Sequence, residues 1–242
     1  MTDRRFYIEP EKINGDNAVL DSNDAHHLKN VLRLKAGNLI ELLNGKGTIF
    51  TARIKKLGKE VELGIEDRQD YPLINPSIHI AQGLLKGKKM DFLIQKATEL
   101  GINGFQPFTS LHGVATAPSA SKRERWQKIM VEACKQSGRA EFMKIGKIKN
   151  FSRICDTGDN FEEKIILWEN EPNNTLQTIG DICAVNSILV IIGPEGGFSR
   201  TEIDRAMDKG FRSVKIGGIT LRAESAAFSI MSILQFMTGK LG

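Results

Sequence analysis

Two glycine-containing segments near the C-terminus carry the charged residues whose types and spacing could do chemistry. Residues 193–197 read Gly-Pro-Glu-Gly-Gly and follow an apolar run at residues 188–192. Residues 217–224 contain Arg222 and Glu224. Glycine lets a backbone approach a ligand closely, and ligands of open α/β sheets lie beyond the carboxyl ends of strands. Both segments are therefore candidate ligand loops, with a plain tight turn between strand and helix as the commoner alternative for a glycine-rich turn.

The first of these loops favours a ligand without phosphate. It lacks the Gly-Lys-Ser/Thr of a phosphate-binding loop and the GxGxxG spacing of dinucleotide-binding proteins. Its Glu195 carboxylate would repel a phosphate group. S-adenosylmethionine, which has an adenosine, a sulfonium cation and no phosphate, fits this loop better. The missing phosphate-loop lysine argues against a nucleotide-dependent enzyme.

Arg222 and Glu224, the two residues of interest in the second loop, differ in how well their charges suit the start of a helix. A carboxylate at the start of a helix is stabilised by the helix macrodipole, so Glu224 needs no functional explanation. The positive charge of Arg222 is unfavourable at the same place unless something pairs with it. Arg222 is therefore the more informative of the two.

Basic residues upstream are candidates for contact with a phosphate backbone. Lys86, Lys88 and Lys89 lie in a flexible loop between an expected strand and an expected helix. Contact with RNA phosphates and a solvated surface loop explain these lysines equally well. Trp126 belongs to an amphipathic helical pattern and is expected to pack in the interior.

The elements that position these residues fall into two groups. In the first seventy residues, short strands and tight turns predict a small β-barrel. Ser22, Asn23 and Asp24 offer N-cap side chains for a short helix. The expected strands span residues 6–8, 18–20, 39–43, 48–54 and 61–65, and the helix spans residues 26–32.

Residues 71–76 are polar, hold two prolines and mark a linker. Beyond them strands alternate with helices, which predicts an α/β domain with a mostly parallel sheet. Capping boxes are expected at Ser121 with Glu124 and at Ser199 with Glu202. The expected strands span residues 77–81, 102–108, 165–168, 188–192 and 213–216, and the helices span residues 90–100, 121–137, 199–210 and 224–237.

Bulk properties restrict the class of protein. The 242 residues suit two small domains, and the net charge of +5 is compatible with an RNA partner without requiring one. The three cysteines show no CxxC spacing and the four histidines no metal-ligand spacing, so neither a disulfide framework nor a metal site is expected. No signal peptide or membrane-spanning run is visible, which predicts a cytoplasmic protein.

Taken together, these segments resemble the ribosomal RNA small subunit methyltransferase E family, which methylates N3 of a uridine in 16S rRNA with S-adenosylmethionine. The matching stretches appear in family order over nearly the whole chain, and the ordered set is more specific than any one of them. They lie at residues 4–7, 27–33, 95–101, 124–126, 132–139, 192–199 and 221–226.

The resemblance implies an N-terminal PUA-like RNA-binding β-barrel over residues 1–72 and a SPOUT methyltransferase domain with a trefoil knot over residues 73–242. It also implies a homodimer with each active site near the subunit interface, and 16S rRNA, within the small ribosomal subunit, as partner. The cofactor pocket for S-adenosyl-L-methionine would be lined by Gly193, Pro194, Glu195, Gly196, Gly197, Ile216, Gly217 and Leu221.

The chain departs from the family pattern at several positions. Ile219 stands where the family usually has an arginine, and Ala223 and Ser225 stand where it has threonines. Leu111 replaces an acidic residue, and His112 falls about where another arginine is expected. Because the methyl-donor loop is intact, these departures bear more on the RNA target than on the cofactor.

The implied reaction assigns roles to the charged residues. N3 of uridine is a poor nucleophile while protonated, so the site needs a base or a cation that stabilises charge on the neighbouring carbonyl oxygens. Arg222 is the candidate cation, and Glu195 or Glu224 is the candidate base. The candidate contacts to the RNA backbone are Arg4, Arg5, Lys29, Arg33, Lys86, Lys88, Lys89 and Arg139.

Two alternatives remain at the level of sequence. One is a SPOUT methyltransferase with another RNA target, either a ribose 2′-hydroxyl or a tRNA base. The other is a non-catalytic RNA-binding or ribosome-assembly factor that kept the fold, to which the departures at Ile219 and Ala223 give some weight.

Overall fold

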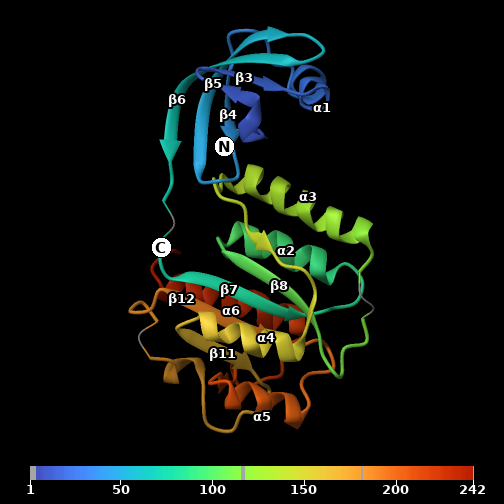
Figure 1. Ribbon diagram of the computed structural model, residues 1–242, viewed down its shortest axis with the longest axis vertical. Helices are drawn as coiled ribbons and strands as arrows, with labels where there is room; N and C mark the ends of the chain where they lie inside the picture. The colour runs from blue at the N-terminus through green and yellow to red at the C-terminus, as the bar shows by residue number, and fades with distance from the viewer. Residues whose placement is uncertain (1–3, 73, 116–117, 181, 242) are drawn as a thin grey trace. The chain divides into compact units, whose positions relative to one another are not determined.

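The chain forms two compact units in a computed structural model that describes residues 4–72, 74–115, 118–180 and 182–241. The first unit comprises Met1–Leu73 together with Val131–Phe142, and the second comprises Ile74–Met130 with Met143–Gly242. Figure 1 labels many of the helices and strands of both units. Among the described residues, no helix is long and apolar enough to cross a membrane.

The first unit is a six-stranded sheet that carries a short helical segment. Its strand order is β1-β4-β5-β6-β3-β2, with β1 parallel to β4 and all other pairs antiparallel. Alternation along β3 and β5 places apolar side chains such as Leu20, Ala52 and Ile54 in one core with Leu28. The strands are β1 (Arg5–Tyr7), β2 (Ile13–Asn14), β3 (Asn17–Leu20), β4 (Leu39–Leu43), β5 (Thr48–Leu57) and β6 (Val61–Asp70).

The helical segment of this unit begins earlier than the sequence suggested. It consists of α1 (Ser22–His26) and a π-helical turn at His27–Val31, and a 3-10 turn lies at Pro10–Lys12. The expected caps at residues 22–24 are wrong, because the Asp21 carboxylate accepts from the N–H groups of Asn23 and Asp24. Arg33 then adopts a φ of 51°, in the left-handed region.

Residues 131–142 belong to the first unit and are bound to it by Arg5. The Arg5 guanidinium donates to the carbonyl oxygens of Lys135 and Gln136 at 3.3 and 3.1 Å, and to Glu41 at 2.6 Å. Gly45 at the β4–β5 turn lies so close to the Phe142 ring that a Cβ there would sit 2.6 Å from it. The end of α3 (Ala120–Ser137) is therefore part of this unit.

The second unit is built on a parallel sheet, as the alternation of strands and helices predicts. Its strand order is β10-β8-β7-β12-β11-β13, with β9 also paired to β8, and every pair is parallel. The central strand β12 (Ser187–Ile192) is buried on both faces. The other strands are β7 (Ser77–Gly83), β8 (Gly104–Thr109), β9 (Lys144–Ile145), β10 (Lys149–Asn150), β11 (Glu163–Leu167) and β13 (Arg212–Val214).

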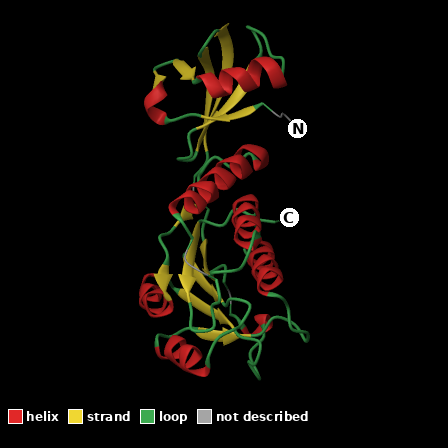
Figure 2. Ribbon diagram, turned by 90° about the vertical axis from the view of Figure 1, so that its right-hand side faces the viewer, coloured by secondary structure: helices red, strands yellow, loops and turns green. Residues whose placement is uncertain are grey.

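Helices cover both faces of this sheet (Figures 1 and 2). On one face α2 (Lys89–Glu99) packs against α6 (Ala223–Met237), which contacts β12. On the other face α4 (Phe151–Thr157) and α5 (Arg200–Asp208) enclose a core that includes Leu189 and Ile191. Short 3-10 turns lie at Gly158–Asn160 and Leu176–Thr178.

The two expected capping boxes have different outcomes. At α5 the Ser199 hydroxyl accepts from Glu202 N, and the Glu202 carboxylate accepts from Ser199 N, so this box is confirmed. The box expected at Ser121 is wrong, because α3 begins at Ala120 and the Ser119 hydroxyl accepts from Lys122 N at 3.3 Å. Trp126 is buried as expected, and its indole N–H donates to Asp91 Oδ1 at 3.0 Å.

Candidate functional site

A cavity of about 370 Å³ opens in the second unit where β11 and β12 end and α6 begins. Both glycine-containing loops line it, together with the residues that follow β11. Carboxyl ends of parallel strands are where open α/β sheets hold ligands, so the cavity lies at the place that the sequence predicted. Its lining comprises Lys89, Leu167, Trp168, Glu169, Ile192, Gly193, Pro194, Glu195, Gly197, Phe198, Lys215, Ile216, Ile219, Thr220, Leu221, Arg222, Ala223 and Ala226.

The Gly-Pro-Glu-Gly-Gly loop is held against the end of β7. Gln82 Nε2 donates to the Gly193 carbonyl oxygen at 3.1 Å. Gly83 packs so tightly on this loop that a Cβ at that position would lie 2.6 Å from Pro194 N. Gly197 has a φ of 67°, a conformation that favours glycine. The short loop therefore depends on glycine both within itself and in the strand beside it.

The segment after β8 approaches the same loop from another side. A Cβ at Gly196 would lie 2.7 Å from the His112 carbonyl oxygen. The N–H of Leu111 donates to Glu202 Oε1 at 2.9 Å, which ties this segment to the start of α5. Leu111 and His112, two departures from the family pattern, thus lie beside the ligand loop.

A buried carboxylate orders the chain just beyond β11. Glu171 is 7% exposed and accepts from Ser213 Oγ and from the N–H groups of Asn173 and Asn174. Burial alone would raise the pKa of Glu171, but these hydrogen bonds lower it below the ordinary value. The turn fixed in this way follows Trp168 and Glu169, which line the cavity.

The second loop leads from β13 into α6. Gly217 has a φ of 67°, and Ile216 and Leu221 face the cavity. Arg222 is the N-cap residue of α6, with φ −63° and ψ 151°, and its side chain makes no capping hydrogen bond. Within the described part of the chain, no ion pair engages Arg222, so its charge is available to a ligand in the cavity.

A three-residue charge cluster, formed by Lys89, Glu195 and Glu224, connects both loops to α2. Lys89 Nζ lies 3.1 Å from Glu195 Oε1 and 3.1 Å from Glu224 Oε2. Glu195 Oε1 also accepts from Lys86 N at 3.2 Å. Burial alone would raise the pKa of Glu195, but backbone hydrogen bonds and the Lys89 ammonium lower it, and the two carboxylates raise the pKa of Lys89.

The structure brings most of the predicted site residues together. Gly193, Pro194, Glu195, Gly197, Ile216, Leu221 and Arg222 line the cavity, and Glu224 reaches it through Lys89. Gly196 and Gly217 belong to the same loops without lining it. Lys89, expected at an RNA surface, lines the cavity as well.

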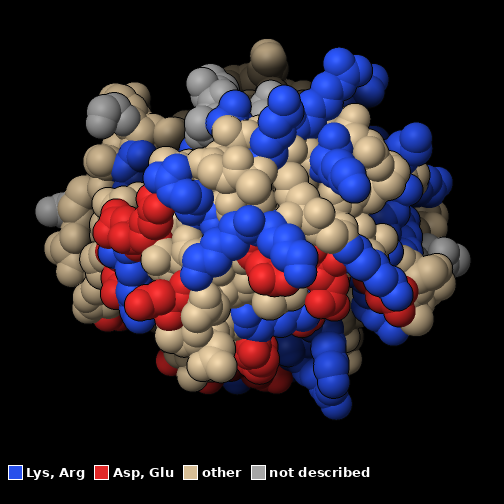
Figure 3. Space-filling view, turned by 90° about the horizontal axis from the view of Figure 1, so that it is seen from above, with Lys and Arg blue, Asp and Glu red and all other residues tan. Residues whose placement is uncertain are grey.

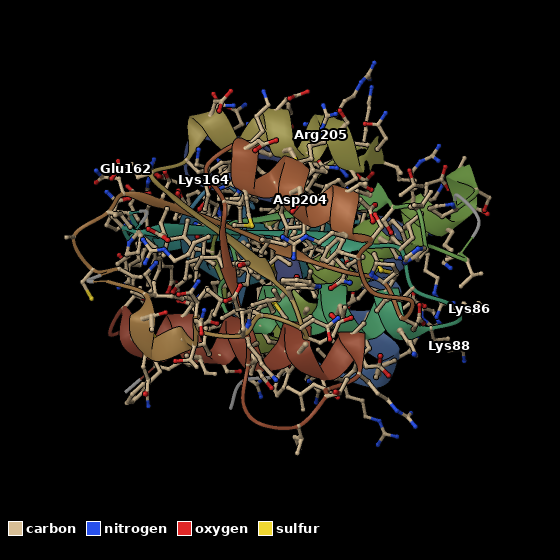
Figure 4. All side chains as sticks on the ribbon, turned by 90° about the horizontal axis from the view of Figure 1, so that it is seen from below. Lys86, Lys88, Glu162, Lys164, Asp204 and Arg205 are labelled. Carbon is tan, nitrogen blue, oxygen red and sulfur yellow. The ribbon has the colours of Figure 1, made fainter. Side chains whose placement is uncertain are left out.

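The other predicted basic residues are not among those that line the cavity. Lys86 and Lys88 are exposed and extend from the rim of the second unit in Figure 4. Arg4, Lys29 and Arg33 are exposed in the first unit, whereas Arg5 is engaged by Glu41 and by carbonyl groups. Arg139 is partly buried in that unit, and burial lowers its pKa.

Sequence reasoning missed five polar or aromatic residues that line the cavity: Trp168, Glu169, Phe198, Lys215 and Thr220. A usable signal existed for the first two, because they directly follow the buried strand β11 and so stand at its carboxyl end. Lys215 follows a three-residue strand whose place beside β11 depends on long-range pairing.

Comparison with known proteins places this site in a class. Residues 73–235 match the family described as an RNA methyltransferase domain, and residues 20–66 match the RNA methyltransferase PUA domain. The chain is thus an RNA methyltransferase with a PUA-like β domain followed by a SPOUT methyltransferase domain on a parallel sheet.

Full-length relatives narrow the class to one family. The chain is 32% identical to ribosomal RNA small subunit methyltransferase E of Aquifex aeolicus, over 95% of this chain and 97% of that one. It is 27% identical to the Bacillus subtilis enzyme of the same name, over 97% of each. The chain belongs to the ribosomal RNA small subunit methyltransferase E family, which confirms the resemblance seen in the sequence.

Two solved structures are similar over nearly the whole chain. The Neisseria gonorrhoeae enzyme of this name, bound to S-adenosylmethionine, has a TM-score of 0.86 and 31% identity, covering 97% of each chain. A methyltransferase of Legionella pneumophila in complex with the same cofactor has a TM-score of 0.87 and 29% identity, covering 98% of each chain.

Proposed function

We propose that this protein methylates N3 of a uridine in 16S rRNA of the small ribosomal subunit, with S-adenosylmethionine as methyl donor. The observation that carries the proposal is the cavity in which the Gly-Pro-Glu-Gly-Gly loop and the start of α6 meet. Relatives over the full length of the chain are small-subunit rRNA methyltransferases, and two similar structures hold this cofactor.

The residues of the cavity fit S-adenosylmethionine. A volume of about 370 Å³ lies within the range of small-molecule sites. Leu167, Ile192 and Leu221 offer apolar surface to an adenine ring, and the exposed Glu169 carboxylate can accept hydrogen bonds from ribose hydroxyls. The charge cluster carries one net negative charge, which favours a cationic sulfonium.

The transfer itself requires alignment, charge stabilisation and removal of one proton. The cofactor supplies a methyl carbon on a positively charged sulfur, and the electron pair of the broken S–C bond stays on that sulfur. Uridine N3 forms the new N–C bond and gives its proton to a carboxylate of the enzyme. Arg222 stabilises the negative charge that spreads over the two uridine carbonyl oxygens.

The partners of the two carboxylates distinguish their roles. Glu195 accepts from Lys86 N and Lys89 Nζ, and its lowered pKa makes it a weak proton acceptor. Glu224 is bound by the Lys89 ammonium and has a side chain that is 18% exposed. We therefore favour Glu224 as the base and assign Glu195 to holding the loop.

The remaining assignments follow from the family and from charge. Residues 1–72 are proposed as the RNA-binding domain and residues 73–242 as the methyltransferase domain of a cytoplasmic homodimer. Arg4, Lys29, Arg33, Lys86 and Lys88 are exposed and free to meet RNA phosphates. Basic side chains are spread over the face shown in Figure 3, among acidic and uncharged ones.

A trefoil knot is proposed as well, as the family implies. Its support is the path of residues 168–186, which connect β11 to β12. The N–H of Lys215 donates to Asn174 O, at the end of β13, and Cys183 Sγ donates to Met237 O, at the end of α6. This connection therefore makes a hydrogen bond near each end of residues 215–237, the segment that would pass through it.

A second function is favoured by one observation. Ile219 lines the cavity and is 74% exposed where the family usually has an arginine. An apolar side chain there cannot hold an RNA phosphate, so a SPOUT methyltransferase with another RNA target is the alternative. The non-catalytic alternative is not supported, because the chain belongs to a family of RNA methyltransferases and has both the donor loop and Arg222.

The decisive experiment is incubation of the protein with labelled S-adenosylmethionine and small subunits that lack the modification, followed by digestion and identification of the nucleoside. Labelled 3-methyluridine is the expected product. Another labelled nucleoside would refute the target but keep the enzyme class. Absence of label beside an active control enzyme would refute methylation of this RNA.

A further inference from the structure

Lys89 is the first residue of α2, a position where a lysine needs an explanation. The positive end of the helix macrodipole disfavours a cation in the first turn. Lys88 precedes it as the N-cap residue, without a side-chain cap, so two lysines stand at this end. Lys88 is exposed in solvent, whereas the Lys89 side chain is only 32% exposed and lies inside the cavity lining.

The Lys89 ammonium is shared by carboxylates from two other parts of the chain. Its distances to Glu195 Oε1 and Glu224 Oε2 are both 3.1 Å. Glu195 comes from the loop after β12, and Glu224 from the first turn of α6. One ammonium thus connects the two loops that form the cavity to the helix after β7.

The pair of carboxylates needs this cation. Their side chains are 27% and 18% exposed, so water screens them only in part. Two carboxylates in one site disfavour each other's ionised form, and an adjacent cation removes that penalty. The other charged side chains that line the cavity are Glu169, Lys215 and Arg222.

We propose that Lys89 is a positioning residue of the methyltransferase site, which fixes the carboxylates of Glu195 and Glu224 through two ion pairs, and that it is not a contact for RNA phosphates. The inference rests on the proposed function in placing the cofactor between these loops. It assigns Lys89 a role that the neighbouring Lys86 and Lys88 do not share.

The test is binding of S-adenosylhomocysteine, measured by calorimetry without RNA. Lys89→Met is expected to weaken binding at least tenfold, because the two loops lose their common partner. Lys88→Met is the matched control, one residue away, and should bind the probe like the wild type. Lys89→Arg restores a cation and should recover most of the affinity.

A pH profile separates positioning from loss of structure. In Lys89→Met, repulsion between the carboxylates should move the acid limb of kcat upward by about one pH unit or more. Adding Glu195→Gln removes one unpaired charge, so the double variant should bind the probe better than Lys89→Met alone. The double variant also carries the test if Lys89→Met does not fold.

Three results would overturn the role of Lys89. They are unchanged probe binding in Lys89→Met, purely additive losses in the double variant, and an effect confined to RNA affinity. Failure of the proposed function would look different. In one case the wild type would not bind the probe at all. In the other it would bind the probe but would methylate a position other than N3 of uridine, and the test of Lys89 would then still be valid.

Discussion

Arg222 and Glu224 stand two positions apart at the start of α6, yet their surroundings differ. Glu224 is paired with Lys89, while no ion pair in the described chain engages Arg222. A carboxylate that shares one ammonium with Glu195 and a guanidinium that lines the cavity without an ion pair suit opposite tasks. The first can take a proton, and the second can stabilise a developing anion.

Replacement of Arg222 by alanine should therefore affect the chemical step more than the cofactor. We expect kcat to fall roughly 10²- to 10³-fold, as for loss of one stabilising donor to an anionic transition state. Affinity for S-adenosylhomocysteine should change less than threefold, because Arg222 is assigned to the uridine carbonyl oxygens and not to the cofactor. Steady-state kinetics beside calorimetry measure both, and full turnover in Arg222→Ala would refute the role.

His79 predicts a pH dependence of stability that is independent of the active site. Burial, with a smaller contribution from Lys144, lowers the pKa of His79, whose ring also packs edge-on against Phe161. The unfolded chain then takes up a proton at about pH 6.5, before the folded chain does. Stability is thus complete above that pH and falls as the pH drops through the folded pKa.

His79→Asn removes the titrating group, so its urea midpoint should decline less between pH 7 and pH 5 than that of the wild type. Urea unfolding of both proteins at several pH values in this range distinguishes the pH-dependent effect from a loss of stability that is equal at every pH. Parallel curves for the two proteins would show that another group is responsible.

At the scale of elements, the ligand loop depends on a strand that is distant in sequence. Gly83 ends β7 and touches Pro194, so the loop after β12 is shaped partly from outside. Gly83→Ala would force the loop away by several tenths of an ångström and should cost about 1–3 kcal/mol of stability. We expect at least tenfold weaker binding of S-adenosylhomocysteine.

Gly218→Ala is the matched control for this substitution. Gly218 also lies in a cavity loop, but a Cβ there would meet no atom within 4 Å. Its stability and probe affinity should stay close to the wild type. Equal losses in both variants would mean that the close approach at Gly83 does not matter.

The sequence predicts features that depend on neighbouring residues better than features that depend on contacts between distant residues. The strand β12, its glycine loop and the Ser199 cap of α5 are local signals, and all were predicted. The helix α4 was missed, because seven residues after the Asn150 cap give too short a periodic pattern. The two ion pairs of Lys89 were also missed, because no local pattern reports pairing between positions 89, 195 and 224.

At the scale of the whole molecule, the proposed function gives RNA binding to the first unit and methyl transfer to the second. The helical segment of the first unit ends at Val31 and is followed by Arg33, which is exposed and has a φ of 51°. A large side chain is rarely found in that conformation, and such strain is a reason to suspect function. Lys29 lies one turn earlier and is also exposed.

Arg33→Gly distinguishes the effect of the backbone conformation at this position from the effect of the side-chain charge. Glycine accepts this φ without a Cβ penalty, so the free energy of unfolding should stay equal or rise by up to about 1 kcal/mol. If Arg33 contacts a phosphate, RNA affinity should fall, and the slope of log K against log salt should shrink by about 0.7–0.9. Lys59→Gln, which removes an exposed charge at the β5–β6 turn of the same unit, is the control. Equal slopes for Arg33→Gly and the wild type would show that the charge of Arg33 does not meet the RNA, and the unusual backbone would then need a structural cause.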